Sequence, residues 1–230
     1  MAILAQLSDP HIRLPPEDEG SGAALEAAVR AVLALDPLPD AVVVTGDLAD
    51  GAQPAEYERV RELLAPLSMP VHLLPGNHDA GVSADYAVRV GELRLVACDT
   101  TIPGHDEGEV DLAWLEAALD EDRKTPTIVA MHHPPILTGI GGLDEIGLTN
   151  RDALAGLLQR SPQVRRVIAG HVHRGAFGVF GGCGVVACPS TNLQAKLEIG
   201  SEGFTTVREP PAFAVHALVD GELVSHLQPI

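Results

Sequence analysis

Five short apolar runs in this chain are each followed closely by Asp, Asn or His. This recurring pattern constrains the fold more than any other feature of the sequence. The runs cover 2–7, 41–45, 71–74, 127–131 and 164–169. Runs of this length and composition are typical of strands that are buried on both faces of a sheet. The polar residues that follow them are Asp9, His11, Asp47, Asn77, His78, His132, His171 and His173. We therefore expect the fold to gather one polar cluster from several strand ends.

Helical patterns separate these strands. Apolar residues recur at the spacing of one helix face over 20–35, from Pro54 onward, over 111–120 and over 150–158. Because strand and helix alternate along the chain, the pattern predicts parallel strands with helices covering the sheet. This part of the sequence therefore predicts an α/β fold.

Beyond His173 the pattern changes to short strands separated by glycines. The predicted strands cover 177–180, 184–187, 213–219 and 223–226. The dipeptide Asp220-Gly221 between the last two is a hairpin signal, so we expect a mixed or antiparallel sheet in the second half. Two stretches, 136–148 and 194–211, show no clear secondary structure. Loops of that length in a compact domain are more often functional or disordered than idle.

The composition predicts one domain in a reducing compartment. The 230 residues are 46% hydrophobic, which is enough for one sizeable core, so we expect a single domain over 1–230. No stretch approaches about 18 consecutive apolar residues, and the amino terminus lacks a signal-peptide pattern, so we expect a cytoplasmic protein without a membrane partner. An odd number of cysteines argues against a disulfide framework, and Cys98, Cys183 and Cys188 are expected to be small core residues.

The charge of the chain excludes one class of partner. The formal net charge is −17 and aromatic residues make up 3% of the sequence. An acidic chain repels polyanions, and few aromatic side chains are available for bases to stack on. Long nucleic acid is therefore not an expected substrate.

The polar cluster has the composition of a metal centre. It holds more Asp, Asn and His side chains than one structural zinc needs, and it contains no cysteine. Such a set suits two divalent cations about 3.5 to 4 Å apart, with a carboxylate and an ionised water between them. Asp47 is the natural bridging carboxylate because it stands alone after its strand. Each residue by itself would be interpreted as a cap or turn residue, and only their joint placement at five strand ends favours the metal site.

Five motifs within 9–173 resemble, in the same order, those of the calcineurin-like metallophosphoesterase family. They are Asp9-Pro10-His11, Gly46-Asp47, Gly76-Asn77-His78-Asp79, His132-His133-Pro134-Pro135 and Gly170-His171-Val172-His173. Segments 132–148, 188–191 and 210–226 further resemble the branch of class III cyclic nucleotide phosphodiesterases and glycerophosphodiesterases. The resemblance implies a four-layer αββα sandwich in which helices flank two mixed sheets.

The resemblance also implies two metal sites. One ion would be held by Asp9, His11, Asp47 and His173, and the other by Asp47, Asn77, His132 and His171. His133 would be a neighbour of the ligands and not a ligand itself. Purple acid phosphatases of the same superfamily carry a tyrosine where this chain has Asp50, so a ferric tyrosinate is not expected. Two divalent ions of manganese, iron or zinc remain open.

The implied reaction is hydrolysis of a small phosphodiester by a hydroxide that bridges the two metals. In this mechanism Asn77 stabilises negative charge on the phosphate and His78 donates a proton to the leaving alkoxide. Asp79 is expected either to cap backbone groups or to orient His78. A phosphomonoesterase or protein phosphatase on the same metals is an alternative. It would need basic groups for a dianion, and Arg13 and Arg174 are the main candidates. A catalytically inactive metal-binding scaffold is a third interpretation, against which the unligated His78 argues.

The sequence leaves the organic half of the substrate open. A 3',5'-cyclic nucleotide such as cAMP would need a platform for its base, for which the candidates are Tyr86, His105, Phe177 and Phe204. A glycerophosphodiester would need only a small polar pocket, for which 136–148 is the candidate. Members of the family often form dimers, so a homo-oligomer such as a dimer is a further expectation.

Overall fold

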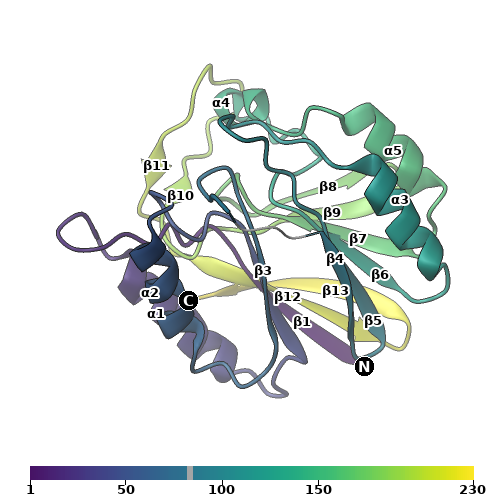
Figure 1. Cartoon of the computed structure of the whole chain (residues 1–230), viewed down its shortest axis with the longest axis horizontal. Coiled ribbons are helices and arrows are strands. Elements are labelled where there is room, and N and C mark those ends of the chain that lie inside the picture. The colour runs from purple at the N-terminus through teal and green to yellow at the C-terminus, as the bar shows by residue number, and fades with distance from the viewer. Residues whose placement is uncertain (82–84) are drawn as a thin grey trace.

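The computed structural model describes residues 1–81 and 85–230 and consists of two packed β-sheets with helices on both outer sides (Figure 1). The first sheet has the strand order β13-β12-β1-β2-β3. Its strands are β1 (Ala2–Leu7), β2 (Ala41–Thr45), β3 (Val71–Leu74), β12 (Ala212–Val219) and β13 (Glu222–Pro229). Strands β1, β2 and β3 run parallel, and β12 and β13 form an antiparallel hairpin beside β1.

The second sheet has the strand order β4-β5-β6-β7-β9-β8. Its strands are β4 (Tyr86–Val90), β5 (Leu93–Ala97), β6 (Thr127–Ala130), β7 (Val164–Ala169), β8 (Ala176–Phe180) and β9 (Cys183–Ala187). Strands β5, β6, β7 and β9 are parallel, whereas the edge strands β4 and β8 are antiparallel to their neighbours. Both sheets are therefore mixed, with a parallel centre extended by antiparallel hairpins.

Four helices cover the outer faces of the two sheets. They are α1 (Ser21–Leu33) and α2 (Pro54–Leu64) on the first sheet, and α3 (Leu112–Glu121) and α5 (Arg151–Gln159) on the second. A capping box between Gln53 and Glu56 begins α2, and the Asp111 side chain accepts a 3.0 Å hydrogen bond from the Trp114 backbone N–H at the start of α3. These side chains satisfy N–H groups that the first helical turn leaves without partners.

The strands are apolar on both sides because each face of each sheet is packed, either against helices or against the other sheet. In β1, Ala5 and Leu7 face the helices, whereas Ala2 and Leu4 face the second sheet. The strands of the second sheet alternate in the same way between the layer between the sheets and the layer under α3 and α5. Full burial of a leucine is worth about 1.5 to 3 kcal/mol, so the strands stay apolar and polar side chains collect at their ends.

Two segments without a clear sequence pattern are structured and contact each other. Segment 136–148 contains the short helix α4 (Gly141–Glu145), and segment 194–211 contains a small antiparallel hairpin of β10 (Gln194–Ala195) and β11 (Thr206–Val207). The Gly200 N–H donates to the Gly139 carbonyl at 2.8 Å. In Figure 1, the labels α4, β10 and β11 mark these segments toward the upper left of the view, outside both sheets.

The four-layer α/β sandwich confirms the predicted fold class, and the predicted strands 2–7, 41–45, 71–74 and 164–169 have the observed bounds. The prediction misses β4 and β5, in which Arg89 and Arg94 face each other across the register and interrupt the apolar pattern. Arg94 is buried, and its guanidinium donates to the Ala118 carbonyl of α3 at 2.6 Å. The three cysteines are free and buried, as expected. Across the described ranges, every helix is too short or too polar to cross a membrane.

Candidate metal centre

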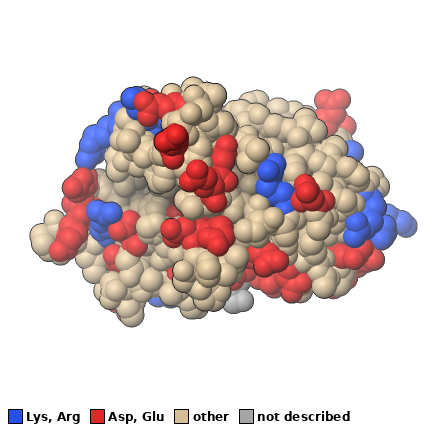
Figure 2. Space-filling model, turned by 90° about the horizontal axis from the view of Figure 1, so that it is seen from above, with Lys and Arg blue, Asp and Glu red and all other residues tan. Residues whose placement is uncertain are grey.

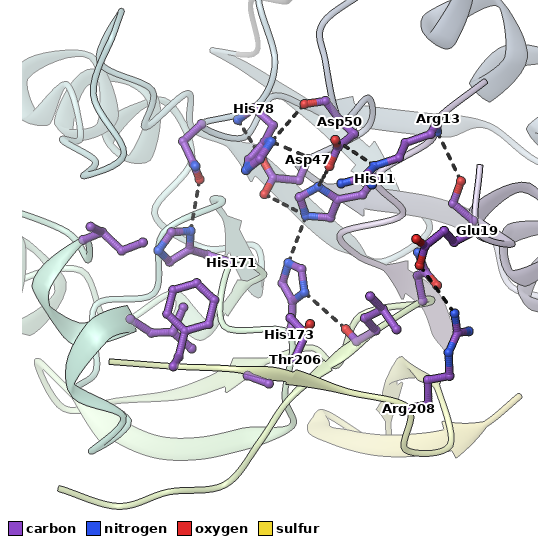
Figure 3. Close-up of a pocket in the computed structure, with 18 residues that line it drawn as sticks. His11, Arg13, Glu19, Asp47, Asp50, His78, His171, His173, Thr206 and Arg208 are labelled. Carbon is purple, nitrogen blue, oxygen red and sulfur yellow. Dashed lines mark hydrogen bonds and ion pairs between the residues drawn. The ribbon is translucent and has the colours of Figure 1, made fainter. Parts of the chain in front are cut away.

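The polar residues that follow the parallel strands meet at one edge of the sandwich. Asp9 and His11 follow β1, Asp47 follows β2, Asn77 and His78 follow β3, His132 follows β6, and His171 and His173 follow β7. The two sheets are joined here by a 2.8 Å hydrogen bond from His132 Nδ1 to the Thr45 carbonyl of β2. All eight side chains predicted from the sequence therefore surround one cavity or lie directly beneath it (Figure 3).

Several of these residues have an unusual backbone conformation. The φ angles of Asp9, His11, Asp47, His171 and His173 are 50°, 44°, 51°, 67° and 48°. These values lie in the left-handed region of the backbone, which residues other than glycine rarely adopt. Hydrogen bonds hold them there, among them His11 N–H to the Asp47 carbonyl at 2.9 Å and His171 N–H to Asp9 Oδ1 at 2.9 Å. Strain of about 1 to 3 kcal/mol per residue that persists at one place is typical of functional sites.

Two glycines let the backbone approach the cluster closely. A Cβ atom on Gly76 would overlap the carboxylate of Asp47, and one on Gly170 would overlap Ser8 Oγ and lie 2.8 Å from Asp9 Oδ2. Any side chain at these positions would displace the carboxylates. The glycines of the motifs are thus explained by the packing of the site.

The first group of donors consists of Asp9, His11, Asp47 and His173, whose ligand atoms lie within 4.8 Å of one another. The Nε2 atoms of His11 and His173 are 2.9 Å apart. His173 Nδ1 donates to the Leu193 carbonyl at 3.2 Å, and His11 Nδ1 lies 3.2 Å from a carboxylate oxygen of Asp50. In the neutral rings both Nε2 atoms therefore carry lone pairs that point at each other, and a cation between them would remove that repulsion.

The second group consists of Asp47, Asn77, His132 and His171. Asn77 Oδ1 lies 3.1 Å from His132 Nε2 and 3.1 Å from His171 Nδ1, and these two nitrogens are 3.3 Å apart. Because His132 Nδ1 donates to a carbonyl, its Nε2 presents a lone pair to the same point. Asn77 Oδ1 and His132 Nε2 thus present lone pairs to one point, and His171 Nδ1 lies beside both, as the ligands of a second cation would.

Asp47 lies between the two groups. Its Oδ2 is 3.2 Å from His11 Nε2 in the first group, and its Oδ1 is 3.5 Å from His132 Nε2 in the second. A carboxylate in this position can bind two cations at once and offset their mutual repulsion. A further observation points the same way: among the described residues, buried Asp9 Oδ2 has no hydrogen-bond partner, and a buried carboxylate oxygen is costly to leave unsatisfied. The donor set fits two divalent ions.

The electrostatics of the cluster favour positive charge. Burial lowers the pKa of His11, but the hydrogen bond to Asp47 and the charges of Asp47 and Asp9 outweigh burial and raise it to about 10. Burial acts to raise the pKa of Asp47, yet His132 and His11 hold it well below its ordinary value. Burial lowers the pKa of His171 and of His173. The site attracts a proton to His11 that a metal ion would replace, while two imidazoles stay neutral as metal ligands must be.

His133 is buried beside the ligands, but both of its ring nitrogens contact other protein groups. Its Nδ1 is 2.8 Å from Thr100 Oγ and its Nε2 donates to the Asp106 carbonyl at 3.0 Å. Burial, with the charge of His132, lowers the pKa of His133 to about 3. Its ring packs against His132 and His171, with centroids 4.8 and 4.6 Å apart. His133 lies close enough to His132 and His171 for the three rings to share a metal ion, but both of its ring nitrogens already contact protein oxygens.

His78 lies at the cavity wall and is held by the loop after β2. Its backbone N–H donates to Asp47 Oδ1 at 3.0 Å, and its Nδ1 donates to the Asp50 carbonyl at 3.0 Å. This leaves Nε2 as the ring nitrogen available to a bound molecule. Of the two roles expected for Asp79, the structure supports the capping role: its carboxylate accepts from the backbone N–H groups of Gly76, Leu48 and Ala49, whereas His78 is held by the Asp50 carbonyl.

The cavity in front of the cluster encloses about 270 Å³. Both arginines in its lining lie beside carboxylates, Arg13 at 2.8 Å from Asp50 and Arg208 at 3.7 Å from Glu19. The hydrogen bond from His11, helped by Arg13, lowers the pKa of Asp50 to about 2. The sequence analysis did not identify Glu19 or Arg208, because neither belongs to a motif and the hairpin that carries Arg208 has no recognisable strand pattern.

Of the aromatic platform candidates, only Phe204 lies in the cavity lining of the described chain. His105 is exposed and bonded to Glu107, and Phe177 is exposed on the edge strand β8. Arg174 does not line the cavity; it pairs with Glu209 at 3.0 Å. On the face shown in Figure 2, acidic side chains are widespread and basic ones form a few smaller groups.

Comparison with known proteins identifies the family. The family model of calcineurin-like phosphoesterases matches residues 3–175. The 3',5'-cyclic adenosine monophosphate phosphodiesterase CpdA of Pseudomonas aeruginosa is 34% identical over 92% of this chain and 83% of its own. The glycerophosphodiester phosphodiesterase GpdQ of Enterobacter lignolyticus is 30% identical over 97% of this chain and 90% of its own. A dimetal phosphatase from Danio rerio shares the fold, with a TM-score of 0.76 and 17% identity over 99% of this chain and 96% of its own. The chain belongs to the calcineurin-like phosphoesterase family.

Proposed function

We propose that this chain is a phosphodiesterase that uses two divalent metal ions to hydrolyse small phosphodiesters, such as a 3',5'-cyclic nucleotide or a glycerophosphodiester. The observation that carries the proposal is the position of Asp47, whose two carboxylate oxygens face separate groups of metal-binding atoms at 3.2 and 3.5 Å. Relatives named as cyclic AMP and glycerophosphodiester phosphodiesterases support the reaction class.

The proposed ligands follow the two groups. Asp9, His11, Asp47 and His173 would hold one ion, and Asp47, Asn77, His132 and His171 would hold the other. Manganese, iron and zinc all accept imidazole and carboxylate ligands. When bound, such ions would supply a water of lowered pKa and positive charge beside the phosphate.

The remaining chemistry belongs to side chains of this chain. Asn77 directs Oδ1 toward His132 and His171, so its amide N–H groups are free to donate to a phosphate oxygen. His78 Nδ1 donates to the Asp50 carbonyl, so Nε2 carries a proton when the ring is doubly protonated; that proton can pass to the leaving oxygen of the diester and leave a neutral imidazole. Asp50 thus holds His11 with its carboxylate and His78 with its carbonyl.

The preference for a diester over a monoester rests on the paired cations. A monoester dianion gains from basic groups free to contact it, whereas Arg13 and Arg208 in the cavity lining already lie beside Asp50 and Glu19. A small diester carries a single negative charge. The few available positive charges in this cavity therefore suit the diester.

The test compares bis(p-nitrophenyl) phosphate with p-nitrophenyl phosphate on manganese-loaded protein. We expect the larger kcat/KM for the diester. A monoester preference of more than tenfold, about 1.4 kcal/mol of transition-state stabilisation, would reject the diesterase in favour of a phosphatase. Metal binding without turnover of either ester would favour a non-catalytic scaffold.

A further inference from the structure

One wall of the cavity is apolar and is built from two segments that are far apart in the sequence. Leu143 lies on α4 and Ile146 directly follows it, while Phe204 and Ala195 come from the β10–β11 hairpin. Leu143 and Ala195 are also buried in one small apolar cluster, on which Ile146 packs. The residues of this wall therefore pack on a small apolar cluster and also line the cavity.

The position of Phe204 depends on a close backbone contact between the two segments. A Cβ atom on Gly142 would lie 2.8 Å from Gly203 Cα and 3.0 Å from the backbone nitrogen of Phe204, and one on Gly141 would overlap the Ser201 carbonyl. Lys196 N–H donates to the Thr205 carbonyl at 2.8 Å and closes the hairpin next to Phe204. Small residues at 141 and 142 therefore allow the hairpin to lie against α4.

The Phe204 side chain has an apolar surface that the protein leaves partly uncovered. The residue is 45% exposed although it lines a concave site, whereas Leu143 beside it is 4% exposed. A flat group placed between the metal centre and the hairpin would cover this surface. Aromatic faces bind planar bases without needing a specific hydrogen-bond pattern.

The same cavity is also lined by the polar side chains of the metal centre, among them Asp47, Asn77 and His78. Its lining therefore offers groups that suit a phosphodiester together with groups that suit an apolar substituent. Glycerol, which is covered with hydroxyl groups, would gain little from contact with Phe204 and Leu143. A planar aromatic substituent would gain from burial and from stacking.

We propose that Phe204, supported by Leu143 and Ile146, determines specificity by receiving a nucleobase of the phosphodiester substrate. This inference rests on the proposed phosphodiesterase function. It assigns the organic half of the substrate to the wall formed by α4 and the hairpin, and it favours a cyclic nucleotide over a glycerophosphodiester.

The test uses two substrates with the same reacting group. Adenosine 3',5'-cyclic monophosphate is compared with the methyl riboside 3',5'-cyclic phosphate, which lacks the base. Phe204→Ala should lower kcat/KM for the nucleotide by roughly tenfold or more, the scale of one lost base-stacking contact, and leave the base-free diester unchanged. Phe177→Ala removes an equally aromatic side chain that does not line the cavity, 60% exposed on β8, and should change neither. Equal losses on both substrates, or no loss, would overturn the proposal.

A second variant tests the backbone contact that positions Phe204, without altering the Phe204 side chain. Gly142→Ala should displace the hairpin and cause the same selective loss for the nucleotide. Gly156→Ala on α5 is the matched control, because a Cβ there meets only Arg160 at an ordinary 3.8 Å. A Gly142→Ala enzyme that keeps the full nucleotide preference would contradict the proposed role of this contact.

A binding measurement separates this inference from the proposed function. Adenosine has no phosphate, so its affinity, measured by calorimetry on metal-free protein, reports on the wall alone. We expect weaker binding to Phe204→Ala than to wild type and Phe177→Ala. If that difference is present but no diester is hydrolysed, the phosphodiesterase fails and the base-binding wall stands. Equal adenosine binding by all three proteins would overturn the wall even in an active diesterase.

Discussion

The Nε2 atoms of His11 and His173 face each other across 2.9 Å, while the Nδ1 atom of each ring is held by a protein oxygen. Burial lowers the pKa of His11, but the carboxylates of Asp47 and Asp9 beside these nitrogens outweigh burial and raise it to about 10, so the site holds a proton that a metal ion would replace. The fold therefore concentrates negative potential at one point, and the conformational strain of the surrounding loops is retained there. A cation at that point would stabilise the folded protein.

Metal binding should therefore raise thermal stability. At a manganese concentration of about 100 times its Kd, one site contributes about 2.7 kcal/mol, which is roughly 5 to 10 °C in Tm for a domain of this size. Magnesium at the same concentration is the control, because it prefers oxygen ligands in octahedral geometry and this site is rich in imidazole. Scanning calorimetry checks the difference. Equal shifts with the two metals would contradict a nitrogen-rich site.

The role of His78 can be separated by leaving group. If its Nε2 donates a proton, His78→Ala should slow a diester with an alkoxide leaving group by roughly a hundredfold or more, and bis(p-nitrophenyl) phosphate far less, since p-nitrophenolate departs without a proton. The measurement is kcat for both substrates at saturating manganese, with metal content verified. His105→Ala is the matched control, because this histidine is exposed and does not line the cavity. Losses of equal size on both substrates would leave His78 with an electrostatic role only.

A buried histidine that is not one of the proposed metal ligands should make stability depend on pH. His216 is buried, with Nε2 3.0 Å from Gln6 Oε1 and Nδ1 2.8 Å from Ser225 Oγ. Burial, with the charge of Arg166, lowers its pKa from 6.5 to about 3. Below about pH 6.5 His216 binds a proton in the unfolded chain but not in the folded chain. The contribution of neutral His216 to stability is therefore complete above that pH and is lost as the pH decreases toward 3.

The expected loss from His216 between pH 7 and pH 5 is about 2 kcal/mol. Chemical denaturation of metal-free protein at both pH values measures it, with His216→Gln as the comparison, because glutamine does not titrate. The variant should lose about 2 kcal/mol less than wild type over this interval. The same pH dependence in both proteins would show that His216 does not carry the effect.

Much of the fold could be predicted because burial on both faces leaves a strong signal. Residues such as Val42 and Val44 on one face of β2 and Val43 on the other are all apolar, so the strand appears as an uninterrupted run. The strands β4 and β5 lack that signal because Arg94 is buried through hydrogen bonds to α3 and not through apolar packing. A buried arginine cannot be distinguished from an exposed one by sequence pattern.

The site divides in the same way. The polar residues at the strand ends are visible in the sequence because each comes within a few positions of the end of an apolar run, and the structure brings them together. The cavity walls are not visible, because Phe204 reaches the site through a hairpin of two-residue strands whose position depends on Gly141 and Gly142 in a distant loop. Contacts of that kind are tertiary and leave no local periodicity. The partner of His78 was missed for a similar reason, since a backbone carbonyl of Asp50 has no sequence signature.

The most direct test of the account is the metal content of Asp47→Asn, measured by elemental analysis after gel filtration in manganese. Because Asp47 lies between the two groups of ligands, we predict that wild type holds about two ions per chain, that His173→Ala loses chiefly one, and that Asp47→Asn loses both. Asp120→Asn, an exposed carboxylate paired with Arg123, should match wild type. If Asp47→Asn retains two ions per chain with full activity, Asp47 does not bridge two metals and the dinuclear centre is wrong.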